Sequence, residues 1–244
     1  MSKRLKFLLN HLAISFVVAL VVIGIVFFIW YPAPLAQAVG VIYIFLMMLI
    51  IDVIIGPCLG FFVYKEGKKT LKMDLAIIIL LQVSALCCGI YSISQGRPVW
   101  LAYNVDRFEL VRKNEIINEN IAQALPQYQY PTWFSPQYVG VEFAKDNKTR
   151  GNDLFMEVLG GISISQKPEH YVTLDKVKHQ IQQHAQDLKL LAKYNNQQAI
   201  QKILVQYPKA DSFVPLQAST IDMTVLINRE NGEVVKIVDL RPWK

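Results

Sequence analysis

The chain has 244 residues, of which 53% are hydrophobic, and a formal net charge of +6. Most of the basic excess lies in residues 1–96, where seven Lys and Arg accompany three Asp and Glu, while residues 97–244 carry 18 basic and 16 acidic side chains. This second part has no basic stripe, so we expect no nucleic-acid partner. It also lacks Cys, since Cys58, Cys87 and Cys88 all precede it, which excludes a disulfide or a thiolate metal site there.

Residues 1–96 contain three nearly uncharged stretches, at about 7–30, 39–64 and 75–94. Each has the roughly 20 apolar residues that a helix needs to cross about 30 Å of hydrocarbon. None shows the periodic polar face that a buried helix of a globular protein displays. The sequence therefore predicts a membrane protein with three N-terminal transmembrane α-helices embedded in the lipid bilayer.

The Lys and Arg residues beside the spans predict which way the spans run, because cytoplasmic flanks are enriched in them. Lys3, Arg4 and Lys6 precede the first span, and four lysines lie within residues 65–72, whereas residues 31–38 carry no charge. Both basic flanks are thus expected in the cytoplasm. Three crossings then place the rest of the chain outside it.

One pattern before the second span has the spacing of a secretory cleavage site, Ala36-Gln37-Ala38. The apolar stretch before it has 24 residues. A signal peptide has an apolar core of about 7–15 residues, so an uncleaved anchor is favoured. Cleavage after Ala38 would leave the same topology.

Polar residues inside the spans are candidates for partner binding. Asp52 lies near the middle of the second span, where an ionised carboxylate costs roughly 2.5–3.5 kcal/mol. Pro57 removes a backbone donor and frees the carbonyl of Val53, and Gly56 lets another helix come close. Gln82 of the third span lies at a comparable depth, so a hydrogen bond from Gln82 to Asp52 is expected.

Three roles remain open for Asp52. It joins helices of this chain, or it accepts a hydrogen bond from another protein's transmembrane helix, or it belongs to a proton or ion pathway. Transport generally needs more polar residues at depth and more than three spans, so the pathway is the least supported role.

Residues 97–244 are expected to form one extracytoplasmic α+β domain, long enough to bury its own core. The hydrophobic patterns predict, in chain order, a strand at 99–110 with a bulge near Asp106, a short helix at 117–124, a strand at 139–145, a polar loop at 146–152, a helix at 153–159, a long amphipathic helix at 174–192 capped by Thr173, a helix at 199–204, and a C-terminal β-hairpin with arms at 223–227 and 234–240.

Residues 128–138 hold five aromatic side chains and two prolines. Tyr128, Tyr130, Trp133 and Phe134 are candidates for a binding ridge, because Tyr and Trp held by prolines give a large contact area at low entropic cost. The same residues suit a loop that packs on the core or rests on the membrane interface. Packing on the core or at the membrane interface is the favoured interpretation over a binding ridge.

The sequence contains no catalytic or cofactor-binding pattern, which predicts that the protein is not an enzyme and binds no cofactor or metal. His179 and His184 are five residues apart, about 140° around a helix, unlike a metal-binding pair. There is no Gly-rich phosphate loop, Gly-x-Ser-x-Gly elbow or His-Glu-x-x-His motif.

Several short motifs occur in a characteristic order: Trp30-Tyr31-Pro32, Asp52-Val53-Ile54-Ile55-Gly56-Pro57, residues 68–76, Gln95-Gly96-Arg97-Pro98, Val105-Asp106-Arg107-Phe108-Glu109, Lys167-Pro168-Glu169-His170-Tyr171 and Asp239-Leu240-Arg241-Pro242-Trp243. In this order and spacing they resemble the type IV pilin accessory protein family of Gram-negative bacteria, the FimB-like group with TfpX and TfpZ. The resemblance covers nearly the whole chain. His170 stands where the family's Pro-Glu-Tyr-Tyr stretch has a tyrosine.

The resemblance implies an inner-membrane protein with a periplasmic domain that assists type IV pilin assembly or modulates pilus extension and retraction, and so twitching motility. Its partners would be pilin or the pilus assembly machinery. Asp52, Gly56 and Pro57 would face the pilin helix, and the domain would face the pilin head. The alternative is a membrane-bound pilin-modifying enzyme acting in the periplasm, for which a clustered acidic or metal site is expected. A signalling module is a third possibility, but the loop at 65–72 is small for an output domain.

Overall fold

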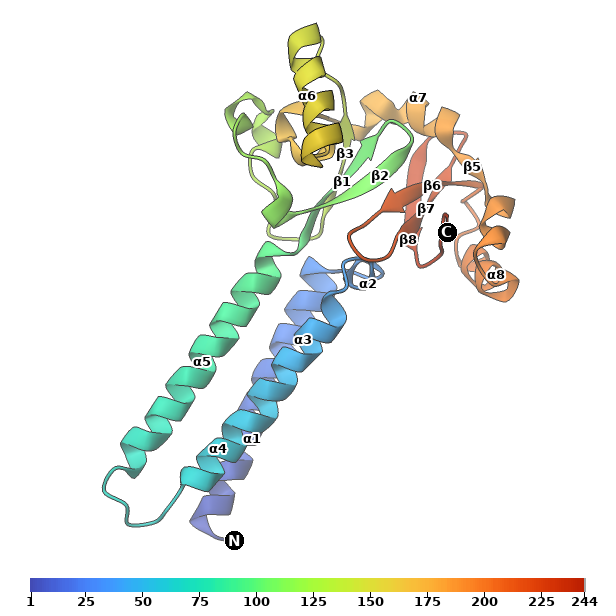
Figure 1. Cartoon of the computed structure of the whole chain (residues 1–244). Helices are drawn as coiled ribbons and strands as arrows, with labels where there is room; N and C mark the ends of the chain where they lie inside the picture. Colours follow the sequence, from blue (N-terminus) through green and yellow to red (C-terminus); the bar gives the residue numbers. More distant parts are fainter. Residues whose placement is uncertain (244) are drawn as a thin grey trace.

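Three long apolar helices form a bundle at one end of the molecule (Figure 1). The structure, a computed structural model, describes residues 1–243. The first span runs through α1 (Lys3–Gly24) into a π-helical segment (Ile25–Trp30), the second through α3 (Val41–Ile50), a π-helical turn (Ile51–Ile55) and α4 (Gly56–Val63), and the third is α5 (Leu71–Gln95). Each is long and apolar enough to cross a membrane, so the prediction of three long apolar N-terminal helices is confirmed.

A domain built on one mixed sheet follows the bundle. Its eight strands run in the order β4-β3-β1-β2-β6-β7-β8, with β5 also paired to β6. They are β1 (Pro98–Asn104), β2 (Arg107–Arg112), β3 (Gln137–Val141), β4 (Tyr171–Val172), β5 (Gln186–Asp187), β6 (Ser212–Gln217), β7 (Met223–Asn228) and β8 (Glu233–Val238). β1 pairs with β3 in parallel, as does β2 with β6, and the other neighbours are antiparallel. The predicted α+β domain and its C-terminal hairpin are confirmed.

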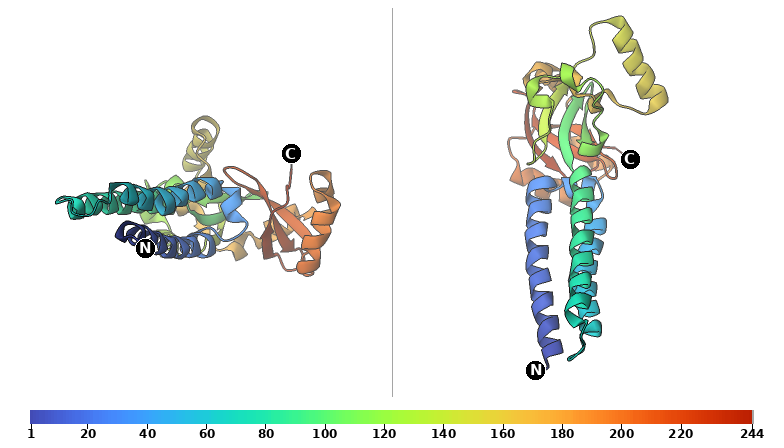
Figure 2. Two further views of the ribbon diagram at one scale, coloured as in Figure 1. Left: turned by 90° about the horizontal axis from the view of Figure 1, so that it is seen from below. Right: turned by 90° about the vertical axis from the view of Figure 1, so that its left-hand side faces the viewer.

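Three helices lie around this sheet (Figure 1): α6 (Asn147–Gly160), α7 (Leu174–His184) and α8 (Gln197–Gln206). The amphipathic α7 buries Val177 and Ile181 in the largest core cluster, as its period predicts. The shorter α8 buries Ile200 in a separate cluster. Helix α6 instead projects from the domain, remote from the bundle (Figure 2). Among its 14 described residues only Asp153 is buried.

The bundle and the domain share a core through the short helix α2 (Leu35–Ala38) between the first two spans. Leu35 and Ala38 are 2% and 0% exposed and lie in the same cluster as the strands and α7. The carbonyl of Ala38 accepts hydrogen bonds from the backbone amides of Thr220 and Ile221 at 3.0 and 3.1 Å. The domain therefore includes this segment as well as the residues after position 97.

The strand predicted at 99–110 with a bulge is wrong, because the chain turns back at Val105 and Asp106 to form the β1–β2 hairpin. Asn104 pairs with Arg107 and Tyr103 with Phe108. A two-residue turn moves the inward side chains from odd to even positions, which explains the change of parity. Val105 adopts a φ of +56°, a strained conformation for a β-branched residue.

Two predicted helices have other bounds. The long helix at 174–192 ends at His184, because residues 186–187 leave the helix to pair with β6 as β5. The predicted polar loop at 146–152 is mostly helical, since Asp146 caps α6 by accepting from the Thr149 amide at 2.8 Å.

Three further differences from the predictions concern the sheet and its connections. No α-helix forms at 117–124 in the described chain, which has one 3-10 turn there (Ile121–Gln123), and the Ile117 amide donates to the Gln166 carbonyl. Strand β3 ends at Val141, four residues before the predicted end. Strand β6 was not predicted.

Candidate partner-binding site in the membrane bundle

Two glycines of α4 set how closely the three spans pack. A Cβ placed on Gly56 would lie 2.1 Å from Oε1 of Gln82 on α5, and one placed on Gly60 would lie 2.8 Å from the Phe7 ring on α1. Both distances are too short for a side chain. The glycines thus let helices of this same chain approach one another.

The π-helical turn before α4 shifts the effect of Pro57 by one residue. In a π-helix each backbone amide donates to the carbonyl five residues earlier. Pro57 has no amide hydrogen, so the carbonyl of Asp52 is left without a backbone donor. Gln82 Nε2 donates to that carbonyl at 2.7 Å, and it also reaches Ser15 Oγ at 3.2 Å. The expected Gln82–Asp52 hydrogen bond therefore exists, but it satisfies the backbone of Asp52 and not its carboxylate.

The carboxylate of Asp52 lies in a groove between the three spans, which we call the Asp52 groove. Its volume is about 270 Å³. The Asp52 side chain is 7% exposed, and its Oδ2 has no hydrogen-bond partner within residues 1–243. The lining residues are His11, Ile14, Ser15, Val18, Ala19, Leu49, Asp52, Val53, Ile79, Gln82, Val83 and Leu86. The groove is thus apolar apart from a few polar atoms near its middle.

The four membrane candidates from the sequence lie together but not all on this groove. Asp52 and Gln82 line it. Gly56 and Pro57 are buried within the bundle, where Gly56 contacts Gln82. These two residues therefore affect the groove only through the packing of the helices, and a partner would reach them only if the helices separated.

The aromatic candidates divide into a buried and an exposed group. Tyr128 is 7% exposed and packs edge-on against Trp100 in the core. Tyr130, Trp133 and Phe134 are 81%, 65% and 70% exposed. Tyr128 thus packs on the core, while the other three side chains are exposed, and we call these three the exposed aromatic patch.

This exposed patch lies at the junction of the domain and the spans. Ser135 Oγ donates to the carbonyl of Ile29, near the end of the first span, at 3.4 Å. Arg97, two residues after α5, donates to the carbonyls of Ser94 and Thr132 at 2.9 and 2.8 Å. Its guanidinium lies 5.2 Å from the centre of the Trp133 ring.

Arg97 is a residue whose role sequence reasoning missed. It is 1% exposed, and burial lowers the pKa of its guanidinium from the usual value. The sequence feature that points to this role is the position of Arg97 directly after an apolar span. An Arg buried there needs carbonyl acceptors, which come from the end of the span and from the domain.

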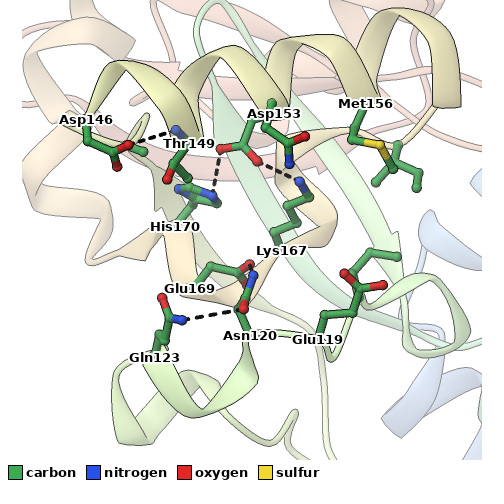
Figure 3. A pocket seen from close by; sticks show the side chains of 14 residues that line it. Glu119, Asn120, Gln123, Asp146, Thr149, Asp153, Met156, Lys167, Glu169 and His170 are labelled. Atoms are coloured by element: carbon green, nitrogen blue, oxygen red, sulfur yellow. Dashed lines mark hydrogen bonds and ion pairs between the residues drawn. The ribbon is translucent and has the colours of Figure 1, made fainter.

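A second, polar pocket of about 440 Å³ lies under α6 in the domain (Figure 3). Asp153 points from α6 toward Lys167, whose Nζ lies 2.6 Å from Oδ1, and toward His170, whose Nε2 lies 3.1 Å from Oδ2. All three side chains are buried. Residue 170, where the sequence departs from the motif that it resembles, lies close to Asp153, but Oδ2 of Asp153 has no hydrogen-bond partner within residues 1–243.

Comparisons with known proteins find similarity to fimbrial assembly proteins. A family model described as fimbrial assembly protein FimB matches residues 1–40. Two fimbrial assembly proteins of Dichelobacter nodosus, of serogroups E1 and I, are 29% and 30% identical over 240 residues, covering 94% of this chain and 92% of each relative. A third, of serogroups C1 and C2, is 34% identical over 117 residues, covering 47% of this chain and 88% of the relative.

No solved structure matches this chain. The family is therefore assigned from sequence. The serogroup I relative is 30% identical to this chain, and the alignment covers 92% of that relative. On that basis the chain belongs to the family of fimbrial assembly proteins.

Proposed function

We propose that the chain is an inner-membrane accessory protein of type IV pilus assembly, which assists pilin assembly or modulates pilus extension and retraction by binding pilin or the assembly machinery. One observation carries the proposal: relatives named fimbrial assembly proteins align with 94% of the chain. The similarity spans the helix bundle and the domain together, so we expect both parts to serve pilus assembly.

The proposed topology follows from the charges at the ends of the bundle. Lys3, Arg4 and Lys6 lie at the same end as the loop between the second and third spans, and Lys3 pairs with Glu66 of that loop at 3.5 Å (Figure 1). The domain lies at the other end. Since basic flanks favour the cytoplasm, the domain is proposed to be periplasmic.

The two candidate surfaces support contact with pilin. A membrane-held pilin presents an apolar transmembrane helix and a periplasmic head. The Asp52 groove offers a lipid-facing contact for the helix, because Ile14 and Val83 on its rim are 65% and 51% exposed. The domain is joined firmly to the bundle through α2, so it can contact the head at the same time.

We also propose that the protein acts by binding and not by catalysis. This keeps the interpretation drawn from the sequence, which lacks a catalytic motif. If the protein modified pilin in the periplasm, deleting it would change the mass of mature pilin. We expect an unchanged pilin mass in the deletion strain.

Photo-crosslinking in the natural host tests the proposal. A photoreactive residue would replace Ile79 on the Asp52 groove or Trp133 on the exposed aromatic patch, and the adducts would be identified by mass. We expect pilin or a protein of the assembly machinery at one or both positions, and fewer surface pili when the gene is deleted. Normal piliation in the deletion strain, with no pilus protein among the adducts, would contradict it.

A further inference from the structure

Asp52 is unusual because it is buried in the bundle with an unsatisfied carboxylate. It lies midway along the second span, between Val41 and Val63. Its side chain is 7% exposed, and within residues 1–243 no group donates to Oδ2. Buried polar atoms in proteins are almost always hydrogen-bonded, and the requirement is stricter in hydrocarbon, where water is scarce.

The nearby side chains do not supply the missing donor. The amide nitrogen of Gln82 is committed to Asp52 O and Ser15 Oγ. The Gln82 oxygen is an acceptor and lies against Gly56. His11 lines the far part of the groove with Nδ1 close to Gly60, 3.6 Å from where its Cβ would lie. The Ser15 hydroxyl and the His11 ring also line the groove, but within residues 1–243 neither makes a hydrogen bond to Asp52 Oδ2.

The groove is open to the membrane on its apolar rim. Ile14, Val18, Ile79 and Val83 are 65%, 39%, 42% and 51% exposed. Lipid chains can cover such a rim, but they carry neither N–H nor O–H groups. A transmembrane helix can cover the same rim and bring a polar side chain to the same depth.

We propose that the Asp52 groove binds a transmembrane helix of pilin and selects one that presents an N–H or O–H donor to Asp52 at the middle of the bilayer. This rests on the proposed function and adds to it the chemistry that the partner must have. A wholly apolar helix gains less, because it leaves the carboxylate unpaired.

Two substitutions of Asp52 separate binding from folding. Asp52→Leu removes the acceptor and relieves the free protein of a buried polar group, so it should raise the melting temperature in detergent. The same change should lower the yield of the pilin crosslink from position 79 by about tenfold, since a hydrogen bond to a buried group is worth roughly that factor. Asp52→Asn keeps an acceptor oxygen of similar shape and should retain most of the crosslink.

Ser84→Leu is the matched control. It also replaces a polar side chain by Leu within a span, but Ser84 is exposed on α5 and does not line the groove. Both the crosslink and the melting temperature should stay close to those of the unmodified protein.

The outcomes are distinguishable. A more stable Asp52→Leu protein that loses the crosslink supports the inference. An unchanged crosslink in a stable Asp52→Leu protein overturns it, because the carboxylate is then satisfied by water or needs no partner, while the proposed function stands. Absence of pilin from the adducts at position 79 of the unmodified chain overturns the inference. If every pilus protein is also absent at position 133 and piliation is normal in the deletion strain, the proposed function is overturned as well.

Discussion

Gly56 shows how one missing side chain sets the geometry of the membrane site. Gly56→Ala would place a methyl group against the Gln82 amide and displace it from Asp52 O and Ser15. Overpacking of this kind costs about 1–3 kcal/mol. We therefore expect a lower melting temperature of the detergent-solubilised protein, measured by scanning fluorimetry or circular dichroism.

Gly24 is the natural control for that experiment. It lies in a span as Gly56 does, but a Cβ added there meets nothing within 4 Å. Gly24→Ala should leave the melting temperature unchanged or raise it slightly, because Ala favours helix by up to about 1 kcal/mol. Equal destabilisation by the two substitutions would mean that the contact with Gln82 is not the cause.

At this scale the sequence predicted which residues meet but not which atoms. The depths of Asp52 and Gln82 in their spans were enough to expect a hydrogen bond between them. The π-helical turn could not be read from residue types, so the freed carbonyl was assigned to Val53 instead of Asp52. For the same reason the carboxylate was expected to be satisfied when it is not.

Helix α6 is attached to the rest of the domain by a buried ion pair. Most helices of a domain are held by an apolar face, but here the buried anchor is Asp153, bound to Lys167 and close to His170. Asp153→Asn would leave Lys167 without its carboxylate. We expect amide exchange of residues 147–160 to accelerate about tenfold to hundredfold, since a hydrogen bond to a charged group contributes roughly 1.5–3 kcal/mol.

The sheet should be unaffected by that substitution, because no strand residue takes part in the ion pair. Glu157→Gln is the matched control, since it removes the same charge from the same helix, where Glu157 forms no ion pair with the described residues. If α6 stays equally protected in Asp153→Asn, the anchor lies elsewhere.

The exposed aromatic patch is expected to rest on the membrane. Trp133 and Phe134 lie beside the ends of the spans, with Arg97 and Lys113 near the Trp133 ring. Trp and basic residues together favour the interface between lipid headgroups and water. A spin label on Trp133→Cys, in a variant with its three native cysteines replaced by Ala, should show reduced access to a water-soluble relaxation agent in liposomes.

A label on Phe155→Cys of α6 provides the aqueous reference, because Phe155 is 59% exposed on the helix remote from the bundle (Figure 2). Equal access at the two positions would exclude contact between the patch and the bilayer.

Elements with a strong period or length signal were predicted well, and those fixed by distant pairing were not. The three spans and the final hairpin are specified locally. Strand β6 contains Pro215, which argues against a central strand. On one side of β6, the pairing with β5 ends at Phe213 and the pairing with β2 begins only at Leu216. Pro215 lies in the gap between them, where its missing N–H breaks no hydrogen bond of the sheet. That arrangement depends on strands far away in the sequence.

On the scale of the whole molecule, the boundary between membrane and domain is a shared core. Tyr31 is 1% exposed and donates to the Ile93 carbonyl at 2.7 Å, which ties the end of the first span to that of the third. Leu35 and Ala38 then enter the core of the domain. Residue types alone do not indicate this contact, since the uncharged residues 31–38 have the composition of a simple connection between two spans.

This shared core predicts that the domain is incomplete without the segment that precedes the second span. A fragment of residues 97–244 lacks Leu35, whose burial is worth roughly 1.5–3 kcal/mol. It also leaves the amides of Thr220 and Ile221 without the Ala38 carbonyl. The fragment should therefore melt at a lower temperature than a second one in which residues 31–40 are joined to residue 94 by a flexible linker. Circular dichroism of the two fragments in solution measures the difference, and the substitution Leu35→Ala in the longer one should remove most of it.

If both fragments unfold at the same temperature, the contact with α2 adds no stability, and the domain could move independently of the spans. If the longer one is more stable, the contact with α2 holds the domain in a fixed relation to the spans, and the proposed contacts of the Asp52 groove and of the domain with a partner would be held in the same fixed relation.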